Sequence, residues 1–157
     1  MKSLKILNKK EKHEIENKLN SQFGVDEIPG DIIMKGKEKM FLFSGSFNGR
    51  EIKKLERITI IERVGAYFAK RDERTDDVRL SIEGTQILKS QFKKNVFELD
   101  EEQTEEWMKG HELRIRTGKK GFLILKYKND FLGTGKASEE KIGNFIPKSR
   151  RLKEKNN

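Results

Sequence analysis

Short strand-like segments follow one another closely between residues 95 and 138. They read NVFELD at 95–100, ELRIRT at 112–117, FLILKYK at 122–128 and FLGTGKAS at 131–138. Parallel strands need crossover connections of about a dozen residues or more, and only one helix-like segment lies among these strands. The turns TGKKG and Asn129-Asp130 are instead short enough to join antiparallel neighbours. This spacing predicts a small β-barrel with one helix.

The segment DEEQTEEWMKG, at 100–110, is predicted to be that helix. Asp100 is a suitable N-cap, and acidic residues fill the first turn, where they stabilise the helix dipole. Gly110 can end the helix. The acidic run is therefore interpreted as capping chemistry.

The first 94 residues are predicted to form a mixed α+β unit on an antiparallel sheet. Asn8 and Glu11 form a potential capping pair, and apolar residues recur at Ile15, Leu19 and Phe23, before Gly24. This pattern predicts one amphipathic helix. The following segments are predicted as a loop at 25–31, strands at 39–44, within 58–72 and at 78–83, and a short helix at 84–92.

The predicted fold class is thus α+β, with an N-terminal α+β domain at 1–94, a barrel domain at 95–152 and a disordered tail at 153–157. Only 33% of the residues are apolar and 39% are charged, so the cores must be small, and ten Phe residues suggest that aromatic rings fill them. Trp107, Phe122, Phe131 and Phe145 are all interpreted as core residues first. No apolar run approaches the roughly 20 residues of a membrane span, and we expect a cytoplasmic protein without a membrane partner.

Positive charge is concentrated in the last third of the chain. Residues 111–157 contain 13 basic and 5 acidic residues, which leaves 22 basic and 21 acidic residues in 1–110, out of 35 and 26 overall. Such asymmetry is typical of a module that binds a polyanion, although a basic solubilising tail has the same composition.

Gly133 and Gly135 are predicted to lie on the same side of a strand, where they leave a patch of backbone without Cβ atoms. Either a ligand approaches this patch or the glycines serve a barrel corner or bulge. Basic residues surround the patch in sequence. Lys126 and Lys128, expected on one face of the paired strand, are joined by Lys136, Lys148, Arg150 and Arg151.

No arrangement of residues predicts an enzyme, a metal site or a cofactor. Without any Cys, disulfides, zinc-thiolate sites and thiol nucleophiles are excluded. His13 and His111 are far apart in sequence, and GTGKAS has the wrong spacing for a phosphate-binding P-loop. His111, between Gly110 and a basic segment, has the better claim of the two to contact RNA, although an ordinary surface role is the more common one for such a residue.

Two stretches carry a family resemblance: NVFELDEEQTEEWMKGHEL and GFLILKYKNDFLGTGKAS. Together they resemble the PUA layout, in which a strand, a short helix ending in Lys-Gly and a hairpin with G-x-G follow one another. Earlier segments resemble the small two-domain ribosome-biogenesis proteins, and the chain is also similar to archaeal PUA proteins associated with the Nol1/Nop2/Sun group. This resemblance implies a C-terminal PUA-like pseudo-β-barrel.

The resemblance implies a non-catalytic RNA-binding protein that acts on rRNA, or tRNA, in ribosome biogenesis or RNA modification. Its partners would be RNA and other assembly factors or an RNA-modifying enzyme. The alternative is a protein-interaction adaptor in a ribosome-assembly complex. The predicted RNA-binding residues are Lys109, Gly110, His111, Lys126, Lys128, Gly133, Gly135, Lys136, Lys148, Arg150 and Arg151.

Overall fold

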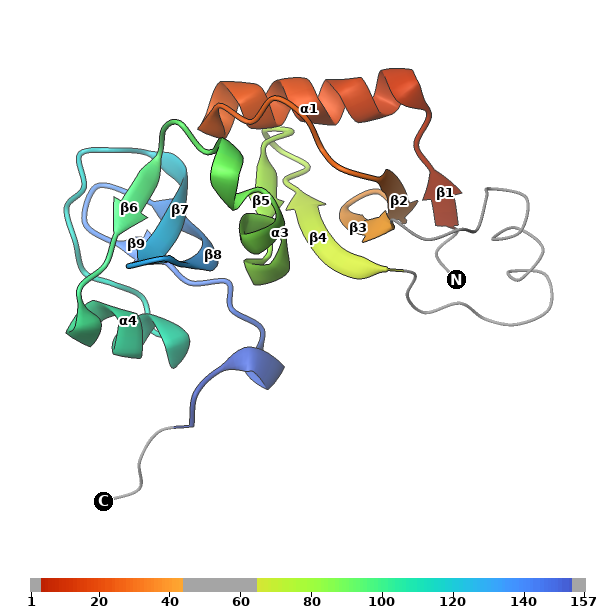
Figure 1. The fold of residues 1–157 in the computed structure, drawn as a ribbon. Coiled ribbons are helices and arrows are strands. Elements are labelled where there is room, and N and C mark those ends of the chain that lie inside the picture. The colour runs from red at the N-terminus through yellow and green to blue at the C-terminus, as the bar shows by residue number, and fades with distance from the viewer. Residues whose placement is uncertain (1–3, 44–64, 154–157) are drawn as a thin grey trace.

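The N-terminal half folds as an antiparallel sheet that packs against one long helix (Figure 1). A computed structural model describes residues 4–43 and 65–153. The sheet has the strand order β1-β2-β3-β4-β5, and each strand is antiparallel to its neighbour. The strands are β1 (Leu4–Ile6), β2 (Asp31–Lys35), β3 (Lys39–Phe43), β4 (Ala66–Arg71) and β5 (Val78–Leu80).

Helix α1 (Lys9–Phe23) has the ends that the sequence predicts. The Asn8 side chain accepts a hydrogen bond from the backbone N–H of Glu11, and the Glu11 carboxylate accepts one from Asn8 in return. Gly24 ends the helix with a φ of 78°, a left-handed conformation that glycine adopts without steric cost. Both helix signals depend on neighbouring residues alone, and both predictions are confirmed.

The predictions for this half missed two strands and misassigned one segment. Strands β1 and β2 were not predicted, because LKI and DIIMK are short and lack alternation. The segment VRLSIE is not one strand: β5 ends at Leu80, and Ser81 caps α3 (Ile82–Ile87) by accepting from the N–H of Gly84. The first part of the strand-rich segment expected within 58–72 lies outside the described residues.

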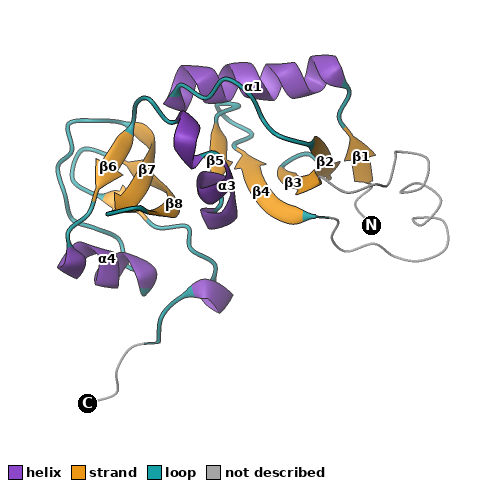
Figure 2. Cartoon of the chain, in the orientation of Figure 1, coloured by secondary structure: helices purple, strands orange, loops and turns teal. Residues whose placement is uncertain are grey.

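The C-terminal half contains a second, curled sheet of order β6-β7-β8-β9. Its strands are β6 (Val96–Glu98), β7 (Gly121–Tyr127), β8 (Asp130–Ala137) and β9 (Ile142–Gly143). Strand β6 is parallel to β7, and the other pairs are antiparallel, with a register shift between Ile124 and Lys126. The predicted strand at 112–117 does not form. Within this segment only Leu113 pairs with a strand residue, in a single bridge with Ile142. This half-barrel is the arrangement expected of a PUA-like domain (Figure 2).

Helix α4 (Glu101–Met108) closes one side of this sheet. Asp100 is the N-cap, as the sequence predicts, and it also forms a capping box with Gln103. The helix buries Trp107 completely. The Trp107 indole Nε1–H donates to the carbonyl of Leu132 on β8 at 3.0 Å. The prediction that Trp107 is a core residue is confirmed.

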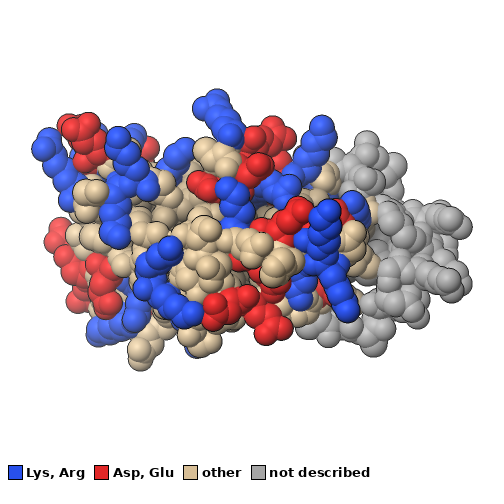
Figure 3. All heavy atoms as spheres, turned by 90° about the horizontal axis from the view of Figure 1, so that it is seen from above, with Lys and Arg blue, Asp and Glu red and all other residues tan. Residues whose placement is uncertain are grey.

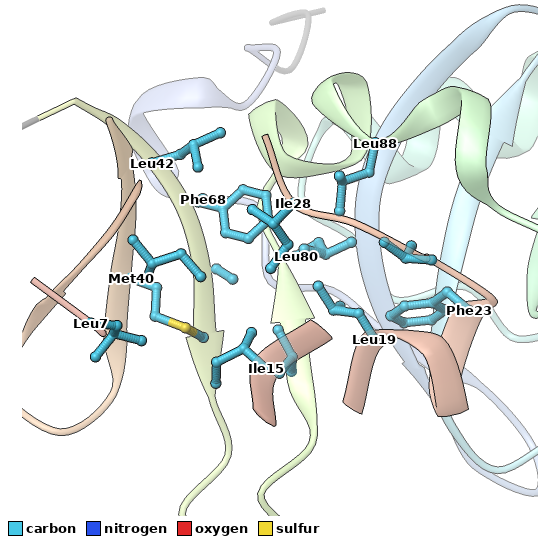
Figure 4. Close-up of a cluster of buried hydrophobic side chains, with 14 of the residues drawn as sticks. Leu7, Ile15, Leu19, Phe23, Ile28, Met40, Leu42, Phe68, Leu80 and Leu88 are labelled. Atoms are coloured by element: carbon cyan, nitrogen blue, oxygen red, sulfur yellow. The ribbon is translucent and has the colours of Figure 1, made fainter. Parts of the chain in front are cut away.

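The hydrophobic core crosses the predicted domain boundary at residue 94. One cluster lies between α1 and the N-terminal sheet, and it includes Leu19, Phe23 and Phe68 (Figure 4). Ile124 and Phe131 of the C-terminal sheet belong to the same cluster. Residues 1–94 and 95–152 therefore share apolar contacts, and their division into two domains stays a prediction. The start of the predicted tail, Lys153, is exposed, and 154–157 lie outside the described residues.

Replacing Asp100 with alanine is expected to destabilise the protein by about 1 kcal/mol, because an N-cap hydrogen bond is lost while the buried helix face is kept. Urea unfolding of the full chain measures this difference. The matched control is Glu139→Ala, which removes an exposed acidic side chain that forms no ion pair with the described residues. An equal loss in both variants would contradict the capping role.

Candidate nucleic-acid interface

The predicted residues at the exit of α4 are engaged in local contacts. Lys109 forms ion pairs with Glu105 and Glu106 at 3.6 and 3.8 Å. The Nδ1 of His111 lies 2.5 Å from a Glu106 carboxylate oxygen, and this hydrogen bond is the main reason that the pKa of Glu106 is lowered. Two of these side chains thus already share one acidic partner.

Gly110 and Arg151 lie in contact with each other, but this contact packs the chain end against α4 and does not form a surface for RNA. Gly110 has a φ of 89°, and a Cβ there would collide with the Arg151 guanidinium group. The Arg151 Nε donates to the carbonyl of Ile146, while the N–H of Leu152 donates to Met108. These bonds fasten the C-terminal segment against α4 and leave Arg151 only partly exposed.

The glycine strand does not present two bare backbone positions to solvent, and the prediction is wrong for Gly135. A Cβ on Gly135 would lie 2.5 Å from Ile142 Cγ2 and 2.8 Å from the Trp107 ring. Side chains of the core therefore occupy the space that this glycine leaves. Gly133 is also buried, but it lies beside Ile82 at the start of α3 and lines a surface groove.

The predicted cations do not form one patch. Lys126 and Lys128 lie near the turn of the β7–β8 hairpin, and Lys128 belongs to that turn with a φ of 52°. They contact the rings of Phe131 and Tyr127. Lys136 pairs with Phe122 near the opposite end of the hairpin, so the expectation of one shared cationic face is wrong. Lys148 is exposed and lines neither of the hollows described next.

A groove of about 450 Å³ lies between the two sheets and the C-terminal segment. We call it the inter-sheet groove. The N-terminal sheet contributes to its lining through β3, β4 and β5, the C-terminal sheet through Gly133 and Thr134, and the chain end through residues 145–147, Ser149 and Arg150. Its cationic side chains are Lys39, Lys70, Arg79 and Arg150, and its aromatic side chains are Phe41, Tyr67 and Phe145.

A second hollow of about 400 Å³ adjoins this groove, because both are lined by Lys70, Arg79 and Phe145. We call it the basic hollow. It adds the cations Arg71, Arg74 and Lys136 and the acids Glu38, Asp72 and Glu73. The N–H of Arg74 bonds to Asp72 and is the main cause of the lowered pKa of Asp72, to which the charge of Lys136 also contributes.

Arg79 and Phe145 mark the junction between the two hollows. The Arg79 guanidinium carbon lies 4.0 Å from the centroid of the Phe145 ring, and Phe122 meets the same ring edge to face at 6.2 Å. Phe145 is 38% exposed, so its interpretation as a core residue is wrong. Within residues 4–43 and 65–153, Arg79 forms no ion pair with a carboxylate. The junction therefore offers a cation and an aromatic surface to a ligand.

Several residues that line the two hollows were missed from sequence: Lys70, Arg71, Arg74, Arg79 and Phe145. The available signal was the alternation in VRL, which places Arg79 opposite the buried Val78 and Leu80. The face on the α1 side shows no comparable cluster of cations, because acidic and basic side chains are interspersed there (Figure 3).

The capped helix α4, the curled sheet and the β7–β8 hairpin define the C-terminal half as a PUA-like domain. Residues 94–152 match the family described as the methyltransferase RsmF PUA domain. Residues 94–152 are thus a PUA domain of this methyltransferase-associated type, and the resemblance inferred from their motifs is confirmed. A PUA domain indicates RNA as the class of partner. No curated protein matches the chain.

The described residues show neither a membrane span nor a metal cluster. No described helix is long and apolar enough to cross a bilayer. Within the same residues, no three His, Asp or Glu side chains are grouped so as to hold a metal ion.

Proposed function

We propose that this protein is a non-catalytic RNA-binding factor that acts on ribosomal RNA, or transfer RNA, during ribosome biogenesis or RNA modification. The observation that carries this proposal is the continuous pair of hollows with Arg79 and Phe145 at its junction. Both halves of the chain contribute cations to it. Cations and an exposed ring side by side are what a ribose-phosphate chain with accessible bases requires.

The RNA is held mainly through its phosphates. Seven cations line the two hollows: Lys39, Lys70, Arg71, Arg74, Arg79, Lys136 and Arg150. Two of them have acidic partners, since Lys70 lies 3.2 Å from Glu38 and Arg150 pairs with Glu83. These pairs are partly exposed, so a phosphate can replace the carboxylate at modest cost.

The chain supplies recognition, and the chemistry belongs to a partner. The matched family is described as the PUA domain of a methyltransferase. We propose that this chain works in the cytoplasm beside an RNA-modifying enzyme or other assembly factors. Crosslinking in cells, followed by sequencing of the bound RNA, tests the identity of the RNA.

The electrostatic part of the proposal predicts a strong salt dependence. If about six phosphates are neutralised on a single strand, log K falls against log salt with a slope of about −4. Fluorescence anisotropy with a labelled single-stranded RNA measures this slope. A slope near zero contradicts the proposal, and capture of protein partners that survives nuclease treatment, together with such a slope, would favour the adaptor.

A further inference from the structure

The inter-sheet groove differs in character from the basic hollow beside it. Its walls include the rings of Phe41 and Tyr67 and the aliphatic side chains of Leu80, Ile82 and Ile146. Its volume of about 450 Å³ lies within the range of about 300 to 1,000 Å³ that is usual for sites of small ligands. The groove can therefore accept a flat, partly apolar group and not only a charged chain.

One residue that lines the groove, Thr134, has a side-chain polar atom without a partner. Thr134 lies in β8 between the two glycines and is 3% exposed. Its hydroxyl is the one buried side-chain polar atom in the described part of the chain that makes no hydrogen bond. Buried polar groups are satisfied in most native structures, so this one needs a ligand or water as its partner. The residue lines the groove, which makes the groove the route by which a ligand reaches it.

The charge at the edge of the groove selects an anionic occupant. Lys39, Lys70, Arg79 and Arg150 line it, and the only acidic residue among its lining residues is Glu83. Glu83 already pairs with Arg150. A ligand with an apolar flat part, hydrogen-bonding edges and a negative charge satisfies the walls, the hydroxyl and the cations together.

We infer that the inter-sheet groove takes up one unpaired nucleotide of the bound RNA, with its base beside Phe145 and within reach of the Thr134 hydroxyl. This inference rests on the proposed function and assigns a subsite to it. The phosphates on either side of the nucleotide meet Arg79 and Lys70. A hydroxyl both donates and accepts, so Thr134 accommodates the edge of more than one kind of base.

A base in a regular RNA duplex cannot enter this groove, because it is stacked and paired and would first have to be extruded from the helix. The protein is therefore expected to bind single-stranded or bulged RNA through the groove and duplex RNA through cations alone. The preference for unpaired RNA comes from the groove, while the affinity shared by both forms comes from the surrounding charge.

The test compares Thr134→Val with Thr134→Ser in the full chain. Two labelled probes are used, a single-stranded oligouridine of about ten nucleotides and a blunt RNA duplex of the same length. Valine keeps the shape of threonine and removes the unpartnered hydroxyl, so the thermal midpoint is expected to stay unchanged or rise. Binding of oligouridine is expected to weaken about 3- to 10-fold, duplex binding to stay unchanged, and serine to retain affinity.

Phe145→Ala provides a second, independent variant. Loss of the stacking surface is expected to weaken oligouridine binding about 10-fold or more, again without an effect on the duplex. Lys89→Ala, an exposed cation outside both hollows, is the control. If both groove variants bind the two probes as the wild type does, or weaken them equally, the inference is overturned. The proposed function fails separately, if loss of the Arg79 charge leaves both probes bound as before.

Discussion

Gly135→Val is expected to unfold the PUA domain rather than to weaken RNA binding selectively. The Cβ of any larger residue at this position overlaps Ile142 and the Trp107 ring, and it approaches the carbonyl of Gly143 to 3.0 Å. The Trp107 ring cannot move freely, because it is fully buried and bonded to Leu132. Overpacking of a core usually costs about 1–3 kcal/mol, and this site combines three obstacles, so we expect a loss of about 3 kcal/mol or more.

A matched control compares alanine at two glycine positions, Gly135→Ala and Gly143→Ala. Gly143 lies on the neighbouring strand β9, where the nearest atoms to an added Cβ are 3.7 and 4.0 Å away. Urea unfolding of Gly135→Ala and Gly143→Ala compares the same added methyl group at a closed and an open site. We expect a large loss of stability in the first and little in the second. If instead Gly135→Val keeps wild-type stability and loses RNA binding, the backbone at Gly135 is a ligand contact after all.

The steric account also predicts that the penalty depends on Ile142. Removing the side chain in Ile142→Ala destabilises the protein by itself, because it leaves a cavity. Adding Gly135→Ala to that variant is then expected to cost less than it does in the wild type, since one of the colliding side chains is gone. Such coupling is expected only between residues in contact.

The parts of the fold that could be predicted from sequence depend on neighbouring residues. The capping boxes at Asn8 and Asp100 and the helix end at Gly24 are encoded within a few positions, because a cap joins a side chain to a backbone group of the same turn. The hairpin of β7 and β8 is equally local. These elements formed as expected, within one or two residues.

The groove could not be predicted, because it joins residues that are far apart in the chain. Nothing near Arg79 indicates that its guanidinium group will lie over Phe145, which follows the PUA hairpin. The glycine strand shows the same limit. The sequence shows that two residues of this strand lack a Cβ atom, but it does not show why. At Gly135 the reason is the Trp107 ring, which belongs to α4 and occupies the space that a Cβ would need.

The net charge of each segment did not predict which part of the chain supplies the cations that line the hollows. Residues 1–110 are almost neutral overall, yet Lys70, Arg71, Arg74 and Arg79 from this region surround the hollows. Of the basic C-terminal third, only Lys136 and Arg150 join them there. Net charge averages over faces that point in different directions, so a neutral segment can still present several cations to one ligand.

Arg79→Glu is expected to have the largest effect on RNA binding of any single substitution in the hollows. Arg79 lines both of them, lies over the Phe145 ring and has no carboxylate partner among the described residues. Loss of a charge-assisted hydrogen bond to phosphate costs about 1.5–3 kcal/mol, which corresponds to roughly 10- to 150-fold in affinity. A carboxylate at the same place also repels phosphate, so we expect the upper end of this range at low salt.

Anisotropy titrations at several salt concentrations measure this effect, with Lys89→Glu as the control. Lys89 is exposed and outside both hollows, and its replacement makes the same change in net charge. The two effects separate a local contact from the overall field, since the field of an exposed charge is screened beyond roughly 10 Å at 0.1 M salt. Equal losses in both variants would mean that the hollows have no special role, and unchanged binding in Arg79→Glu would direct the search to Lys109 and His111 at the exit of α4.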